Sequence, residues 1–138
     1  MTVELTWRGR FENAEVNALH ATAFGTRVFS DDEWNWRVLV EHHSLGWVVA
    51  RDEVGLVGFA NVVSDGLVHA WLQDVMVDER VRHQGVGRAI VGACAVGARA
   101  AGCEILHVDF DDDLAAFYID SCGFTPTKAG LLHLAPDQ

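Results

Sequence analysis

The stretch Arg82-His83-Gln84-Gly85-Val86-Gly87-Arg88 decides the fold, because it joins an apolar strand to a helix. The strand is Val75-Met76-Val77, and the helix begins near Gly85. Glycines in such a turn allow backbone angles and close approaches that a Cβ would block, so several N–H groups can converge on an anion. The helix start adds N–H donors without partners and the positive end of the helix dipole. The sequence therefore predicts a phosphate-binding turn.

The charge around this turn is positive, although the chain carries a net charge of −10. Three arginines and no acidic residue lie in the segment 80–88. A P-loop is excluded, since it needs Gly-Lys followed by Ser or Thr and the only lysine is Lys128. A dinucleotide fingerprint is disfavoured, because Ile90 stands where a third small residue belongs. Taken alone, the turn also fits an ordinary helix start with solvated arginines.

A second segment, 111–124, predicts a short amphipathic helix with both ends marked. It opens on the capping acids Asp111-Asp112-Asp113 and stops at Gly123. Apolar side chains recur at a spacing of three or four residues along it. These side chains are Leu114, Phe117, Tyr118 and Cys122.

The order of the two segments, with a strand between them, resembles the GNAT (GCN5-related) N-acetyltransferase superfamily. The resemblance rests on Arg82-x-x-Gly85-x-Gly87 after a Val-x-Val strand, and on Phe117-Tyr118 shortly before Gly123-Phe124. It extends from Gly46 to about Thr127. It implies an α/β fold with a mixed, mostly antiparallel central sheet flanked by helices and splayed at the acetyl-CoA site.

The resemblance implies acetyl-CoA as co-substrate. The pyrophosphate would lie on the backbone of the turn, and the pantetheine arm would pair with the preceding strand as an added strand does. The cofactor-binding candidates are Val75, Met76, Val77, Arg82, His83, Gln84, Gly85, Val86, Gly87, Arg88 and Asp111. Asp111 stands where many members carry an asparagine; a carboxylate accepts a hydrogen bond but does not donate one, and a role as helix cap alone is the alternative.

Tyr118 is the candidate catalytic residue. In the family, a tyrosine at this place often donates a proton to the departing CoA thiolate, and a phenol with a pKa of about 10 suits that transfer. The alternative is a phenol packed in the core with its hydroxyl group satisfied.

The general base is left open by the sequence. Many members carry a glutamate on the strand before Val-x-Val, but the positions in register here are Gln73 and Trp71, neither of which is a base. Asp74 has the chemistry but the wrong parity, unless a bulge turns it inward. His69 and Glu33 are further candidates. Positioning alone could also suffice for an amine that is partly neutral.

A small cationic amine is the favoured acceptor, because an acidic protein attracts cations and repels nucleic acid. The same acidity also fits a plain solubility role. Candidate acceptor-binding residues are Glu33, Trp34, Trp71 and Gln73, with the tryptophans as an aromatic wall for an alkyl ammonium group. Trp34 and Trp36 lie two positions apart, so one of them belongs to the core or to a dimer contact.

The remaining pattern predicts a single domain over residues 1–138, without a membrane-spanning run or a leader, and a cytoplasmic location. Three cysteines without CxxC spacing predict free thiols, and no metal site is predicted. The expected strands are 3–7, 47–50, 56–60, 67–77, 105–110 and 131–134, and the expected helices are 13–24, 32–43 with Asp31 or Asp32 as cap, 86–101 and 111–122.

Three functions stay open at this point: a small-amine N-acetyltransferase, a protein or peptide acetyltransferase, and a non-catalytic acyl-CoA-binding module. The absent strand glutamate is what suggests the third. Dimers are common in the family, and the sequence does not decide for or against a homodimer.

Overall fold

The computed structural model describes residues 2–136 and divides into two compact units, the first ending at Val108 and the second beginning at Asp109. No helix among these residues has the length and apolarity needed to cross a bilayer. The two units are described separately.

The first unit is built on a five-stranded sheet in which the strands follow their chain order. Neighbours are antiparallel from β1 to β4, and β5 runs parallel to β4. This mixed, mostly antiparallel sheet confirms the predicted fold class. The strands are β1 (Glu4–Trp7), β2 (Ser44–Arg51), β3 (Leu56–Ser64), β4 (His69–Val77) and β5 (Ile105–His107).

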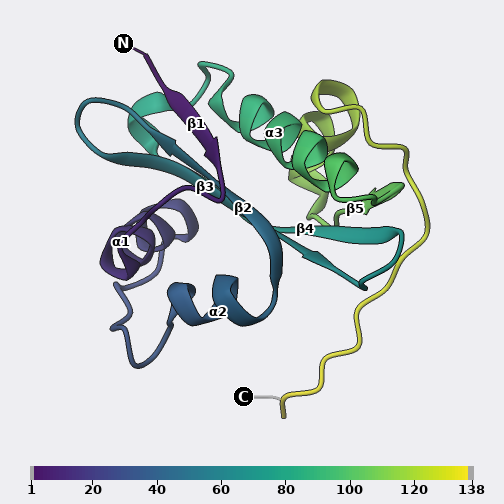
Figure 1. Cartoon of the computed structure of the whole chain (residues 1–138), viewed down its shortest axis with the longest axis horizontal. Helices are drawn as coiled ribbons and strands as arrows, with labels where there is room; N and C mark the ends of the chain where they lie inside the picture. The colour runs from purple at the N-terminus through teal and green to yellow at the C-terminus, as the bar shows by residue number, and fades with distance from the viewer. Residues whose placement is uncertain (1, 137–138) are drawn as a thin grey trace. The chain divides into compact units, whose positions relative to one another are not determined.

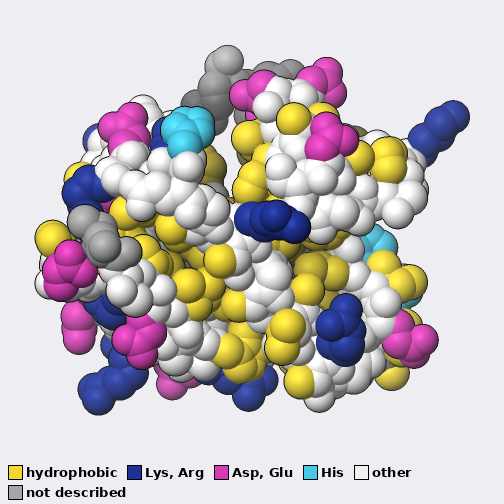
Figure 2. Space-filling model, turned by 90° about the horizontal axis from the view of Figure 1, so that it is seen from above, with side chains coloured by type: hydrophobic (Ala, Val, Ile, Leu, Met, Phe, Trp, Pro, Cys, Tyr) yellow, Lys and Arg dark blue, Asp and Glu magenta, His cyan; other side chains and the backbone are white. Residues whose placement is uncertain are grey.

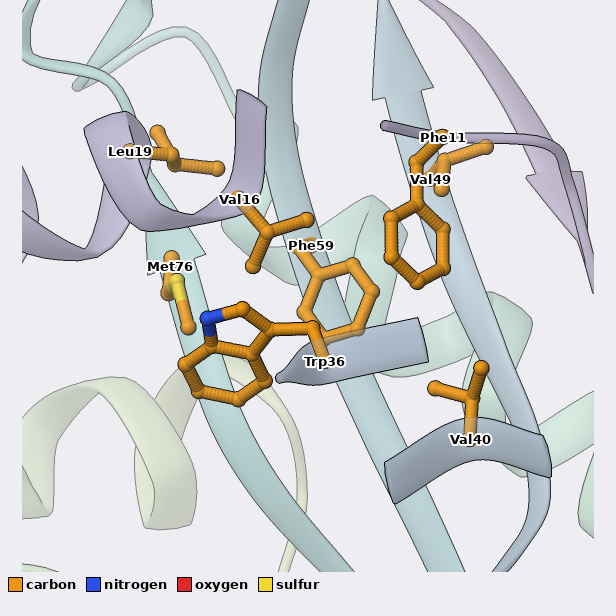
Figure 3. Close-up of a cluster of buried hydrophobic side chains, with 8 residues drawn as sticks. All are labelled: Phe11, Val16, Leu19, Trp36, Val40, Val49, Phe59 and Met76. Carbon is orange, nitrogen blue, oxygen red and sulfur yellow. The ribbon is translucent and has the colours of Figure 1, made fainter. Parts of the chain in front are cut away.

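Helices cover both faces of this sheet (Figure 1). They are α1 (Asn13–Phe24), α2 (Trp36–His42) and α3 (Val86–Ala100). On the face of α1 and α2, Trp36 packs edge-on against Phe59, with ring centroids 5.9 Å apart. Figure 3 shows its indole beside Met76 as well. Burying a large apolar side chain of this kind contributes roughly 1.5–3 kcal/mol, so this cluster fixes α1 and α2 on the sheet.

Two buried asparagines of α1 hold the start of α2. Asn13 accepts the backbone N–H of Trp36, and Asn17 accepts the indole N–H at 2.8 Å. Both amide groups also donate to the carbonyl of Trp34, at 3.1 Å. Because an unpaired buried amide is costly, these bonds fix the chain leading into α2 as well as the helix itself.

The second helix begins later than predicted. It is capped by Asn35, whose side chain accepts the N–H of Val38, and not by Asp31 or Asp32. The preceding residues form a turn closed by N–H groups of Glu33 and Trp34 that donate to Ser30. A capping residue needs a free N–H two or three positions on, and here that position belongs to Asn35.

Helix α3 packs closely on β1 through a glycine. A Cβ on Gly97 would lie 2.6 Å from the indole of Trp7, whereas one on Gly92 would meet nothing within 4 Å. We expect Gly97→Ala to destabilise the fold by about 1–3 kcal/mol through overpacking. Gly92→Ala should stabilise it by up to about 1 kcal/mol through helix propensity. Urea unfolding of the two variants measures both, and equal shifts would contradict the packing of Trp7 against α3.

The second unit is less regular than predicted. Residues 111–122 form a 3-10 turn η2 (Asp112–Leu114) and a π-helical turn η3 (Ala116–Ser121), not one α-helix. Leu114 is exposed, so the apolar face is shorter than its spacing indicated. The predicted strand 131–134 is absent, and its leucines are exposed; an apolar run becomes a strand only where a partner satisfies its backbone. Similarly, β5 ends at His107, short of the expected residue 110.

Candidate active site

A β-bulge lies in the middle of β4. Gln73 pairs with Asn61 and Met76 pairs with Phe59, so Asp74 and Val75 together face one residue of β3. Asp74 has φ of 57°, a left-handed conformation that is uncommon for a residue other than glycine. Strained residues of this kind are found at functional sites more often than elsewhere.

The bulge overturns the predicted register of β4. The extra residue inverts the alternation of side chains along β4. Gln73 and Trp71 therefore lie on the sheet face covered by α1 and α2, together with Met76. The predicted register had placed them on one face with Val75 and Val77. The sequence places Asp74 on the inner face only if a bulge is present, and the structure contains that bulge.

Asp74 belongs to β4, which packs against α1. Burial raises the pKa of its carboxyl group, and the nearby His20 opposes part of that rise. A carboxylate that has lost much of its hydration is a better proton acceptor than an exposed one. Asp74 is therefore the carboxylate on β4 with the chemistry of a general base.

The sheet opens directly beside this bulge. Strand β5 pairs with β4 only from His69 to Trp71, and within the described residues no strand continues along that edge of β4 toward Val77. Unpaired backbone groups on a strand edge accept an added extended chain. An extended, amide-bearing chain could pair along this edge, which contains the predicted residues Val75, Met76 and Val77.

The predicted phosphate turn has the expected backbone. Gly85 is left-handed, with φ of 81°, and caps α3. The first helical bond runs from the N–H of Ala89 to the carbonyl of Gly85, so the N–H groups of Val86, Gly87 and Arg88 have no acceptor among the described residues. These donors, with the positive end of the dipole of α3, fit a pyrophosphate group.

The arginines around the turn are not equivalent. Arg80 forms an ion pair with Asp52 at 2.8 Å, and this bond lowers the pKa of Asp52 to about 2. The charge of Arg80 is thus compensated by Asp52 in the β2–β3 turn. The segment 80–88 alone did not indicate this partner. Arg82 donates to the carbonyl of Val77 at 3.3 Å, and Arg88 is exposed. His83 and Gln84 are exposed in the same turn.

On the α1 and α2 face, Trp71 stacks on His107 with ring centroids 4.8 Å apart. Nδ1 of His69 lies 2.8 Å from Nε2 of His107. The predicted residue Gln73 follows on the same face and is exposed. His69, a candidate base, is therefore already engaged in a hydrogen bond.

Glu33 is also engaged. Arg27 pairs with it at 2.5 Å and the N–H of Ser30 donates to it, and these bonds lower its pKa to about 2. Such a carboxylate is a poor base. Trp36 is buried, whereas Trp34 remains 48% exposed, which is the division expected from their spacing.

Sequence reasoning missed His20 and Phe29, which both contact Trp34. The ring of Trp34 stacks with Phe29 and His20 at centroid distances of 5.8 and 6.1 Å. The signal for this cluster was weak, because the residues come from α1 and from an irregular segment with no periodicity to orient them.

In the second unit, Tyr118 is buried and stacks on Phe110 at a centroid distance of 5.0 Å. Asp111 occupies the cap position of η2, but its exposed side chain makes no capping bond. Its carboxylate is thus available to a ligand of this unit.

Thiol and metal chemistry find little support in the described residues. Burial raises the pKa of the Cys94 thiol to about 12, which makes it unreactive. No group of three metal-binding side chains occurs within residues 2–136.

Solved structures with the same fold are acetyltransferases. A probable acetyltransferase from meticillin-resistant Staphylococcus aureus is 20% identical, with a TM-score of 0.78 over 98% of this chain and 100% of that one. The aminoglycoside acetyltransferase meta-AAC0020 from a soil metagenomic sample, in complex with sisomicin, is 19% identical, with a TM-score of 0.75 over 99% and 97%. AAC(6')-Iy with a CoA bisubstrate analogue is 14% identical, with a TM-score of 0.77 over 99% and 100%.

No curated protein matches the sequence. The family model described as acetyltransferase (GNAT) family matches residues 12–124, which include the phosphate turn, the bulge of β4 and Tyr118. The chain therefore belongs to the GNAT acetyltransferase family, whose members use acetyl-CoA.

Proposed function

We propose that the chain forms a single N-acetyltransferase domain that transfers an acetyl group from acetyl-CoA to the primary amine of a small cationic molecule. The observation that carries this proposal is Asp74, a partly buried carboxyl group held by a bulge at the point where β4 and β5 separate. The sequence has no glutamate at the expected positions of β4, which suggested a non-catalytic module. Asp74 would act as the general base in its place. The structural neighbours include an aminoglycoside acetyltransferase and a glucosamine-6-phosphate N-acetyltransferase, and these names support an amine acceptor.

Bound acetyl-CoA would supply a thioester carbonyl carbon as electrophile. Asp74 would take the proton of the ammonium group, so that the amine nitrogen can form the new C–N bond as the C–S bond breaks. Tyr118 would give its phenolic proton to the departing sulfur, and the second proton lost by the amine nitrogen would pass through water to the phenolate. The products are the N-acetyl amine and CoA thiol, and both side chains recover their protonation states by exchange with water.

Tyr118→Phe tests the acid. We expect kcat to fall by about 10²-fold or more, with an unchanged dissociation constant for acetyl-CoA, because the proposed proton transfer to the leaving thiolate follows cofactor binding. Release of CoA thiol, followed with a thiol-reactive dye, gives the rate. The ring of Phe preserves the stacking on Phe110, so unfolding is not expected; an unchanged kcat would remove Tyr118 from the mechanism.

We also propose a cytoplasmic location. Cys94, Cys103 and Cys122 form no disulfide bond, which suits a reducing compartment.

A further inference from the structure

We infer that the acceptor is an amine with a flat or extended apolar body, and that an aromatic cluster beside Asp74 binds that body. The acceptor cluster consists of His20, Phe24, Phe29 and Trp34. This inference rests on the proposed function and narrows its substrate class.

The cluster offers an apolar surface to solvent. His20 lies 4.9 Å from Phe24 and 5.7 Å from Phe29, centroid to centroid, and Trp34 stacks on two of these rings. Yet Phe24 is 51% exposed and Trp34 is 48% exposed. Large aromatic side chains gathered and left half-exposed mark a binding surface more often than single exposed ones do.

His20 connects this surface to the proposed base. Its ring centroid lies 5.6 Å from that of Trp36, which packs in one cluster with Met76, two residues after Asp74 on β4. Its Nδ1 atom is buried and has no hydrogen-bond partner among the described residues. A buried polar atom without a partner is costly, so it is expected to meet one in the complex.

The charged pair beside the cluster carries no net charge. Glu33 is paired with Arg27, whose guanidinium lies 4.6 Å from the ring centroid of Phe29. The aromatic rings are therefore what this edge of the cluster offers to the body of the acceptor.

In Figure 2, acidic side chains (magenta) lie at separate places on the drawn face, with apolar side chains (yellow) between many of them.

The experiment compares kcat/KM for 2-phenylethylamine, hexylamine, ethylamine and spermidine in wild type, Trp34→Ala and Trp34→Phe. Leu67→Ala, which removes an exposed apolar side chain from the β3–β4 turn, is the control. We expect wild type to prefer 2-phenylethylamine over spermidine at least about tenfold. Trp34→Ala should lose about tenfold for 2-phenylethylamine, mainly in KM, with little change for ethylamine, and Trp34→Phe should retain most of the preference. Leu67→Ala should match wild type.

Calorimetric binding of 2-phenylethylamine to the protein with CoA present gives a readout that does not need turnover. Binding weakened in Trp34→Ala supports the cluster even if no amine is acetylated, in which case only the proposed activity fails. Transfer to spermidine that exceeds transfer to 2-phenylethylamine, or 2-phenylethylamine binding equal in wild type and Trp34→Ala, would overturn the inference and leave the proposed activity standing.

Discussion

Asp74→Asn is expected to lower kcat/KM for the acceptor amine by about 10²- to 10⁴-fold, the range over which a positioned general base accelerates proton transfer. The amide preserves the shape of the side chain but accepts no proton at working pH. Affinity for acetyl-CoA should stay unchanged, because the proposed cofactor contacts are to backbone groups of β4 and of the turn 82–88. Release of CoA thiol measures kcat/KM for the amine, and calorimetry measures the affinity for acetyl-CoA. Equal turnover in variant and wild type would rule Asp74 out as the base.

The pH dependence gives an independent check. Asp74 acts as a base only when it is deprotonated, and burial raises its pKa. We therefore expect kcat/KM of the wild type to rise with pH through an inflection above the ordinary value of about 3.9 for an aspartate. Asp74→Asn should lose this limb, while a purely structural role of Asp74 would leave it in place.

Stability should change in the opposite direction to activity. A carboxyl group whose pKa is higher in the folded than in the unfolded state binds more protons when folded, so it favours the fold below the unfolded pKa and loses this contribution as pH rises through the folded pKa. At neutral pH, Asp74→Asn is thus expected to melt at a higher temperature than wild type, with a smaller difference in acid. Thermal unfolding at the two pH values checks this.

Much of the fold was predictable because local signals agreed with it. The bounds of α1, Asn13–Phe24, match the prediction, and α3 begins at Val86 directly after the left-handed Gly85. Helices of this kind are specified by caps and periodicity within a few residues. The turn that precedes α3 is partly local: a glycine marks the left-handed Gly85, whereas nothing in the sequence marks the left-handed His83, with φ of 63°.

The register of β4 around Asp74, the candidate base, could not be predicted for a physical reason. A bulge is set by how two strands align, and nothing in Leu72-Gln73-Asp74-Val75 marks an extra residue. Strict alternation therefore placed Gln73 on the same face as Val75. The pairing of Arg80 with Asp52 was hidden in the same way, since it joins residues that are 28 positions apart. Both features depend on tertiary contacts that propensity does not encode.

Gly87→Glu should abolish measurable binding of acetyl-CoA. Gly87 lies in the first turn of α3, where its N–H has no acceptor among the described residues, and a side chain there adds bulk and a like charge beside the proposed pyrophosphate. Juxtaposed like charges cost several kcal/mol, so we expect affinity to fall by about 100-fold or more. Folding should be preserved, because an acid in the first turn of a helix interacts favourably with the helix dipole.

Gly92→Glu is the matched control for this experiment. It places the same charge on the same helix at an exposed position where a Cβ meets nothing within 4 Å. If acetyl-CoA binds to wild type and to Gly92→Glu with equal affinity and fails to bind Gly87→Glu, the start of α3 is the phosphate site. If both variants bind less tightly by the same factor, net charge accounts for the loss. If both bind as wild type does, the pyrophosphate lies elsewhere and the free N–H groups of the turn serve only to begin the helix.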